Sequence, residues 1–195
     1  MILTFLDTET TGLDPLQHEV IEVAMLQVKV DKNFNYGDIS CYEAKIKPRH
    51  IKRASPVALK INGYTSAKWR LAHKAVEVLP IIKEWVEESD YLVGQNLIFD
   101  HNFINQLFDR ENLERPKYPK YFDTKKMAQV LVDEGSIKRT ALDYLCENFN
   151  IPTIGRAHTA LADVLRTFEL FKKLSTTIKP ESLSFKKPYD PFKGK

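Results

Sequence analysis

The stretch LDTETTGL, from Leu6 to Leu13, places two carboxylates, Asp7 and Glu9, one residue apart after the apolar run MILTFL. In an extended strand both side chains would lie on the same face, roughly 7 Å apart along the backbone. Carboxylates at that separation repel each other unless a positive group lies between them. Mg²⁺ or Mn²⁺ is the simplest candidate, because both prefer oxygen ligands. The alternative is that the strand ends at Asp7 and that residues 8–12 form a solvated turn.

A third acid, Asp100, occurs in YLVGQNLIFDHNFI, where the pattern predicts a buried strand, a turn and then a helix. Asp100 would fall in the first turn of that helix, just after the strand ends. Binding sites in α/β sheets tend to collect at strand ends. The alternative is an acid that is placed there only because it suits the helix dipole.

The stretch GRAHTALADVLRTFELF contains His158 and Asp163. Thr159 is a suitable cap for the predicted helix, and Asp163 lies about one turn into it, beside an apolar face. An acid in that position should point into a cleft or find a partner. The two residues can converge only if His158 lies on the loop before the helix, where Gly155 favours mobility. The alternative for His158 is a surface or capping residue.

These residues depend on elements that bring them together. Three apolar or alternating segments predict an antiparallel meander of strands, because the joins between them are short. Ser55 followed by Pro56 predicts a helix start, and that helix should end near Gly63. A kink is expected at Pro80 in the next helix. The predicted strands are 2–7, 19–30, 39–48, 91–95 and 120–124, and the longer predicted helices are 72–89, 99–112, about 124–134, 140–149 and 159–174.

This order of elements predicts an α/β domain with a mixed sheet. No GxGxxG or GxxxxGKS motif occurs, so a dinucleotide site or a P-loop has no support. The two cysteines, Cys41 and Cys146, form no CxxC or Cys/His cluster, which argues against a disulfide framework or structural zinc.

The bulk properties describe an ordinary globular chain of 195 residues with a net charge of +3. No apolar run approaches the roughly 20 residues that span a bilayer. We therefore expect a cytoplasmic protein that begins at Met1 and has no membrane contact. Residues 172–195 hold seven lysines against two acids, so the C-terminal tail either contacts nucleic acid or is simply solvated.

Four acids and one histidine, each at the end of an element, follow the order Asp-x-Glu, Asp, His-x4-Asp. This order resembles the DEDDh, or DnaQ-like, 3′–5′ exonucleases, which include polymerase proofreading subunits, exonuclease X, ribonuclease T and oligoribonuclease. The resemblance covers about residues 1–174 and leaves 175–195 as a basic tail. FLDTETTGL resembles the first exonuclease motif, LVGQNLIFDHNFI the second and HTALADVLRTFELF the third. The chain departs from the usual pattern in GQNLIFD and NGYT, which could alter specificity.

The resemblance implies a ribonuclease H-like fold, with a five-stranded mixed sheet that has one antiparallel strand and is flanked by helices. It also implies hydrolysis of the terminal phosphodiester with two Mg²⁺ or Mn²⁺ ions. Asp7 would bridge both ions, Glu9 and Asp163 would complete the first site, and Asp100 would hold the second. His158 would be the general base.

For the substrate, the resemblance implies that the 3′ nucleotide rests on the Thr10–Thr11 turn, with Leu13 and Ile61 beside the terminal base and Asn96 as a weaker candidate. Leu13 and Ile61 are alternatively ordinary half-buried residues. We expect removal of nucleotides from DNA 3′ ends, alone or beside a polymerase or another replication or repair protein. An exoribonuclease of the ribonuclease T or oligoribonuclease type is the alternative, followed by a non-catalytic nucleic-acid-binding module.

Overall fold

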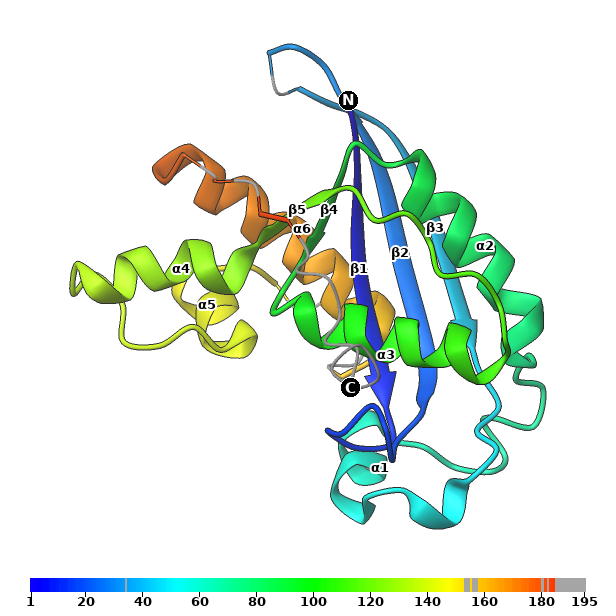
Figure 1. The fold of residues 1–195 in the computed structure, drawn as a ribbon. Coiled ribbons are helices and arrows are strands. Elements are labelled where there is room, and N and C mark those ends of the chain that lie inside the picture. Colours follow the sequence, from blue (N-terminus) through cyan, green and yellow to red (C-terminus); the bar gives the residue numbers. More distant parts are fainter. Residues whose placement is uncertain (34, 153–154, 156–157, 180, 182, 185–195) are drawn as a thin grey trace, which may run out of the picture.

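The computed structural model describes residues 1–33, 35–152, 155, 158–179, 181 and 183–184. Its centre is a five-stranded mixed sheet with the order β3-β2-β1-β4-β5 (Figure 1). The strands β1, β2 and β3 form an antiparallel meander, while β4 runs parallel to both β1 and β5. The strands are β1 (Ile2–Thr10), β2 (Val20–Val30), β3 (Tyr36–Lys45), β4 (Tyr91–Gly94) and β5 (Lys120–Asp123).

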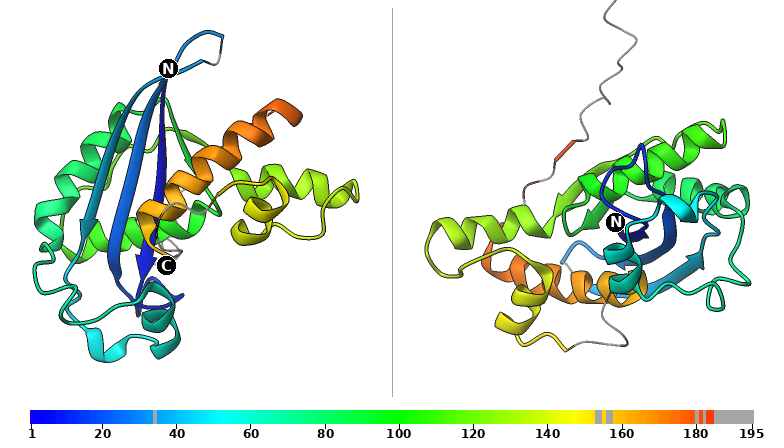
Figure 2. Two further views of the ribbon diagram at one scale, coloured as in Figure 1. Left: turned by 180° about the vertical axis from the view of Figure 1, so that it is seen from behind. Right: turned by 90° about the horizontal axis from the view of Figure 1, so that it is seen from below.

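Helices cover both faces of this sheet (Figures 1 and 2). On one face, α2 and α3 pack on the sheet, and on the other face α6 packs on β1 and β2 with α4 and α5 against it. The helices are α1 (Pro56–Asn62), α2 (Ala75–Glu88), α3 (Ile98–Arg110), α4 (Thr124–Asp133), α5 (Leu142–Asn148) and α6 (Ala160–Thr177), with a 3₁₀ turn, η1, at Ile51–Arg53. The predicted α/β class and the single antiparallel strand, β2, are confirmed.

The alternation of side chains along β1 determines where its acids point. Phe5 lies on the α6 face, where its ring centroid is 5.1 Å from that of Phe168 and 5.7 Å from that of Phe171. Leu6 belongs to the core on the α2 and α3 face. Successive side chains of a strand point to opposite faces, so Asp7 and Glu9 continue the row of Phe5 and face the start of α6.

Three predicted strand boundaries were wrong by three residues. β1 does not end at Asp7, because Thr8, Glu9 and Thr10 continue the pairing with β2. Both acids therefore lie within a paired strand, and the alternative of a solvated turn is wrong for residues 8–10.

The third strand begins and ends three residues earlier than predicted. Asp31 accepts hydrogen bonds from the backbone N–H groups of Asn33 and Asn35, which closes a tight turn and lets Tyr36 pair with Val30 at once. At the other end β3 ends at Lys45. Ile46 still donates to the carbonyl of Ile21 on β2, at 2.8 Å, and forms an isolated parallel bridge with His73.

The helix predicted after Ser55 is present: its hydroxyl accepts from the N–H of Ala58, and Gly63 closes the helix with a left-handed φ of 64°. Only Gly tolerates such a backbone without strain. Helix α2 continues through Pro80.

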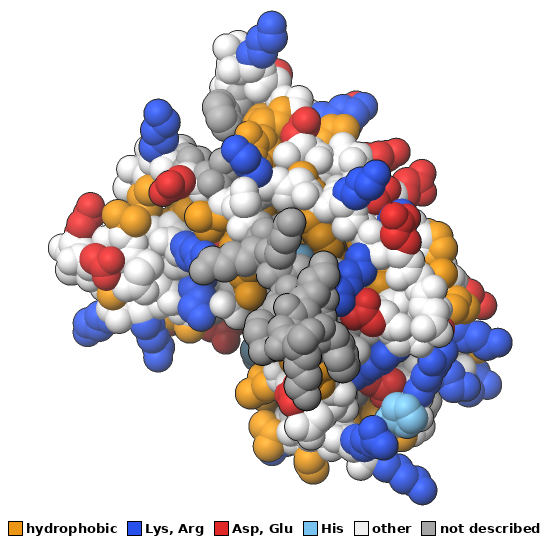
Figure 3. All heavy atoms as spheres, viewed as in Figure 1, with side chains coloured by type: hydrophobic (Ala, Val, Ile, Leu, Met, Phe, Trp, Pro, Cys, Tyr) orange, Lys and Arg blue, Asp and Glu red, His pale blue; other side chains and the backbone are white. Residues whose placement is uncertain are grey.

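Lysine and arginine side chains are spread widely over the face shown in Figure 3. None of the described helices is long and apolar enough to cross a bilayer.

The C-terminal region is described in part. Helix α6 ends at Thr177, beyond the boundary expected at 174. Further on, Leu183 exchanges two backbone hydrogen bonds with Tyr121 of β5, at 2.9 and 2.8 Å. This contact covers part of the β5 edge. Residues 185–195, which hold most of the basic tail, lie outside the described residues.

Candidate active site

Three acids from the two ends of the chain meet beside β1. Oxygens of Asp7, Glu9 and Asp163 all lie within 4.8 Å of one another. Asp7 and Glu9 project from β1, and Asp163 comes from the first turn of α6. The helix starts there because the Thr159 hydroxyl accepts from the N–H of Ala162. Three carboxylates at this spacing can share one hard divalent cation, since oxygen is the donor that Mg²⁺ and Mn²⁺ prefer.

Asp100 joins this group from the other side of β1. It lies in the first turn of α3 and is 3% exposed. Its Oδ1 accepts hydrogen bonds from the backbone N–H and the hydroxyl of Thr8, at 2.9 and 2.7 Å. Thr8, which lies between Asp7 and Glu9 on β1, thus holds Asp100, because its side chain points to the opposite face of the strand from theirs.

Several carboxylates are buried close together at this site, and their pKa values are raised. Burial, followed by the charges of Asp163, Glu22 and Asp100, raises the pKa of Glu9 to about 8. Burial raises the pKa of Asp100 to about 7, although the two bonds from Thr8 act in the opposite direction. Burial and the charges of Asp100 and its neighbours raise the pKa of Asp7 well above its ordinary value. Such shifts arise because several carboxylates are buried close together, an arrangement that a divalent cation would stabilise. Donor type, spacing and charge therefore fit divalent metal ions.

Glu22 is a further acid at this site that the sequence reasoning missed. It stands directly opposite Glu9 on β2 and is 1% exposed. Its Oε1 accepts from the backbone N–H of Ala160, the first residue of α6, at 3.2 Å. Glu22 therefore joins the sheet to the start of the helix that carries Asp163. An acid in an otherwise apolar strand, EVIEVAML, was the available signal.

Asp163 has a cationic neighbour in Arg166. Burial raises its pKa, while Arg166 and the nearby His158 lower it. Arg166 Nη1 lies 3.0 Å from Asp163 Oδ1, and Arg166 Nη2 lies 2.6 Å from Asp143 Oδ1. The sequence reasoning had noted only the apolar face of this helix and not its arginine.

His158 lies just before α6, as the loop placement requires. Its φ of 61° is in the left-handed region, and the next residue, Thr159, caps the helix. A non-glycine residue with such a backbone is uncommon and often marks a functional site. The charge of His158 is close enough to lower the pKa of Asp163. Gly155 also has a positive φ, of 80°, and residues 153–154 and 156–157 of this loop lie outside the described residues.

The proposed substrate turn is braced by its own hydrogen bonds. The Thr10 hydroxyl donates to the carbonyl of Gly12 at 2.6 Å, and the Thr11 hydroxyl accepts from the N–H of Glu19 at 2.9 Å. Asn62 of α1 donates to the carbonyl of Thr10. Gly12 is required because a Cβ there would collide with the ring of His18. Thr10 and Thr11 are buried, so they shape the turn.

The three remaining predicted substrate residues are exposed. Leu13 is 83% exposed and Ile61 is 49% exposed, so Leu13 offers most of its apolar surface to solvent and Ile61 about half. Helix α1, which carries Ile61, lies beside the turn that carries Leu13 (Figure 1). Asn96 has a φ of 66°, and its backbone N–H donates to Asp123 Oδ1 at 3.0 Å. Asp123, an acid at the end of β5, could have been found by the same strand-end criterion.

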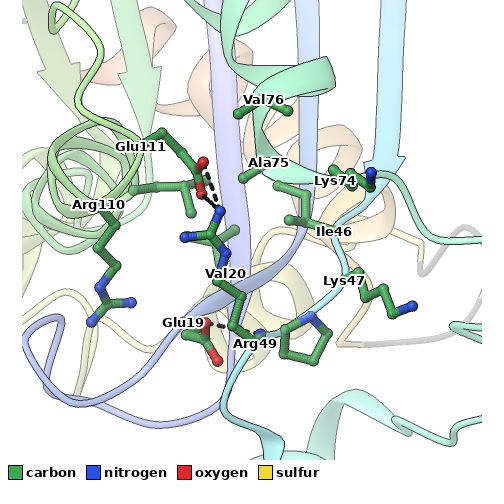
Figure 4. A pocket seen from close by; sticks show the side chains of 12 residues that line it. Glu19, Val20, Ile46, Lys47, Arg49, Lys74, Ala75, Val76, Arg110 and Glu111 are labelled. Carbon is green, nitrogen blue, oxygen red and sulfur yellow. Dashed lines mark hydrogen bonds and ion pairs between the residues drawn. The ribbon is translucent and has the colours of Figure 1, made fainter.

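A cavity of about 550 Å³ lies on the opposite face of the sheet from the three clustered acids (Figure 4). The Arg49–Glu111 ion pair crosses it, at 2.6 Å. One of its walls is Arg110, which donates to the backbone carbonyls of Pro15, Leu16 and His18. Glu19 forms another wall, and its carboxylate accepts hydrogen bonds from two backbone N–H groups in the loop after β3. The residues around the cavity thus brace the segment that follows the substrate turn.

Comparison with known proteins is consistent with this geometry. The sequence model of a family described as exonuclease matches residues 4–171. The chain belongs to this exonuclease family. It is 29% identical over 179 residues to the PolC-type DNA polymerase III of Oceanobacillus iheyensis, a match that covers 91% of this chain and 12% of that protein. It is 28% identical over 178 residues to ribonuclease T of Shewanella sp. (strain ANA-3), covering 85% and 78%.

This exonuclease domain therefore spans about an eighth of the length of the PolC-type relatives. Solved structures share the fold. E. coli exonuclease I in complex with a dT13 oligonucleotide superposes with a TM-score of 0.75 at 20% identity, covering 90% of this chain and 41% of that one. The nuclease domain of 3′hExo, a DEDDh family member bound to rAMP, gives 0.73 at 18% identity, covering 95% and 97%.

Proposed function

We propose that this exonuclease domain removes nucleotides one at a time from the 3′ end of DNA, with two Mg²⁺ or Mn²⁺ ions. The observation that carries the proposal is the convergence of Asp7, Glu9 and Asp163 within 4.8 Å, with Asp100 reaching the same strand through Thr8. When bound, two such ions would activate water and stabilise the leaving 3′-oxygen.

The residues of the chain have separate tasks in this proposal. Asp7 would help to hold both ions, Glu9 and Asp163 would complete the first site, and Asp100 would hold the second ion. His158 accepts the proton of the attacking water, and its place on a loop lets it approach once the substrate is bound. Metals are required before substrate, because the ion-free site repels a polyanion.

The substrate end is recognised by shape. Thr10 and Thr11 form a rigid turn beneath the terminal nucleotide, and Leu13 and Ile61 pack against its base. Apolar packing on a base tolerates any sequence, since every base has a flat face. Asn96, at the positive-φ turn after β4, lies beside the strand end and contacts the substrate more peripherally.

RNA is the second candidate substrate. The relatives named ribonuclease T, of which this chain covers 78%, favour it, while the PolC-type relatives favour DNA and a polymerase partner in replication or repair. The domain proposed for the chemistry is residues 1–174, followed by the basic tail 175–195, which either contacts the phosphate backbone or is simply solvated.

The test uses matched DNA and RNA oligonucleotides that carry a label at either end. With Mg²⁺ or Mn²⁺, a 3′ label should be released at once as a mononucleotide, whereas a 5′ label should report a ladder of shortening products. EDTA should abolish both, and Asp7→Asn, which keeps the shape of the side chain, should reduce the rate at least about a thousandfold. Faster decay of RNA would replace DNA as the substrate, and no shortening of either in metal would refute the proposal.

A further inference from the structure

Arg166 is a buried cation that contacts a candidate metal ligand. Its side chain is 4% exposed and lies one helical turn after Asp163 on α6. One guanidinium nitrogen is 3.0 Å from Asp163 Oδ1, and the other is 2.6 Å from Asp143 Oδ1 on α5. A buried arginine needs such partners, and its planar fork fixes the direction of each carboxylate that it binds.

Arg166 can select the orientation of the Asp163 carboxylate. Asp7 and Glu9 project from a strand that is paired along its length with β2. Asp163 reaches the same point from the first turn of α6, and its side chain has a small set of staggered rotamers. With Oδ1 held by Arg166, the carboxylate has one defined orientation toward Asp7 and Glu9.

Asp143 holds the other end of the arginine. Its side chain is 65% exposed, so this acid is part of the protein surface and not of the metal site. The chain Asp143–Arg166–Asp163 thus runs from the outside of α5, through a buried guanidinium, to the candidate ligand. It also joins α5 to α6 close to the site.

We propose that Arg166 is a positioning residue for the metal site, which holds Asp163 in the orientation that binds the first ion, and that Asp143 in turn holds Arg166. This inference rests on the proposed function, because it assumes that Asp163 is a metal ligand. Electrostatics alone would give the opposite effect: removing a positive charge beside a cation site tightens cation binding. A weaker site in the absence of Arg166 therefore reports lost positioning.

The test measures Mn²⁺ binding directly, by electron paramagnetic resonance of free Mn²⁺ or by calorimetry, on the full chain without substrate. The variants are Arg166→Met, which keeps the apolar stem, Arg166→Lys, which keeps the charge without the fork, and Asp143→Ala. Glu147→Gln is the matched control, because Glu147 also lies on α5 and is exposed. Circular dichroism establishes that each variant is folded, and hydrolysis is measured over a range of Mn²⁺ concentrations.

Loss of a hydrogen-bonding support for a metal ligand usually weakens binding by about 10–100-fold, and we expect this range for Arg166→Met. Arg166→Lys should bind Mn²⁺ more tightly than Arg166→Met, because it keeps the charge. Asp143→Ala should weaken Mn²⁺ binding by about threefold to tenfold, because Arg166 still contacts Asp163. Saturating Mn²⁺ should restore most of the hydrolysis rate in each, and Glu147→Gln should match the wild type.

Unchanged or tighter Mn²⁺ binding in folded Arg166→Met would overturn the inference, since the arginine would then be only structural or would compete with the ion. If Arg166→Met does not fold, wild-type binding in Asp143→Ala has the same consequence. A wild type that binds no Mn²⁺ at all would refute the proposed function itself, and that result is distinct from any difference between variants.

Discussion

Replacing Glu9 by Gln should stabilise the metal-free protein at pH 8 and have little effect at pH 5. The fold raises the pKa of Glu9 from 4.5 to about 8. Between these values the unfolded chain has an ionised Glu9 while the folded protein keeps the proton. The stability that the protonated group contributes is complete below pH 4.5 and is lost as pH rises toward 8. Gln at this position does not titrate, so the variant avoids the loss.

The size of the effect follows from the same pKa. At 1.36 kcal/mol for each pKa unit, the upper limit is about 5 kcal/mol. Glu9 is partly exposed, and solvent reduces this to roughly 1–3 kcal/mol. A protein of this length changes its Tm by about 2–4 °C per kcal/mol. We therefore expect the metal-free variant to melt about 2–12 °C above the wild type at pH 8.

Thermal denaturation followed by circular dichroism, in EDTA at pH 5 and at pH 8, measures this difference. Adding Mn²⁺ at pH 8 should reverse the order, because the wild type gains ligand-binding energy that the variant has lost. Glu88→Gln, an exposed glutamate at the end of α2, is the matched control and should leave Tm unchanged at both pH values.

Two results would contradict this reasoning. If Glu9→Gln melts with the wild type in EDTA at pH 8, Glu9 does not carry an unfavourable charge in the fold. If the gain is as large at pH 5 as at pH 8, it has a cause other than ionisation.

Three further changes test the supports of the site. Glu22→Ala should lower the free energy of unfolding by about 1–3 kcal/mol, because it leaves the Ala160 N–H without its acceptor. Denaturant titration measures this difference, and wild-type stability would show that the bond is dispensable. Thr8→Val should raise the Mn²⁺ concentration needed for half-maximal hydrolysis about tenfold or more, since Asp100 loses its hydroxyl donor, and a wild-type metal requirement would argue against that role. Leu13→Ala should raise KM about fivefold through the loss of roughly 1 kcal/mol of apolar contact with the base, with Tm unchanged because Leu13 is exposed; an equal KM would remove Leu13 from the binding site.

Sequence reasoning located the acids because each of them interrupts an apolar pattern. Asp7 and Glu9 follow a buried run, Asp100 follows another, and Asp163 lies beside an apolar helix face. The same patterns were sufficient for the α/β class and for the meander of the first three strands, because hydrophobic periodicity and short joins are local signals. The structure brings three of these acids within 4.8 Å, as their residue types suggested.

The supports of the site were harder to predict, because they depend on register and on packing between distant segments. Glu22 faces Glu9 only in the observed pairing, and a shift of one residue would turn it to the other face. Arg166 meets Asp143 because α5 packs on α6. The Thr11 hydroxyl accepts from the N–H of Glu19, because the chain folds back onto the turn. None of these contacts has a signature at short sequence separation.

The distance along the chain between Asp7 and Asp163 has a consequence during synthesis. Domains tend to fold as their chain emerges, N-terminal parts first. A chain translated as far as α3 already contains Asp7, Glu9 and Asp100, yet it lacks α6 and therefore Asp163 and the Glu22–Ala160 bond. An incomplete chain thus cannot assemble the ligand cluster near nucleic acid. Helix α6, which follows the other described helices along the chain, completes the site, so the ligand cluster forms only once this helix has been made.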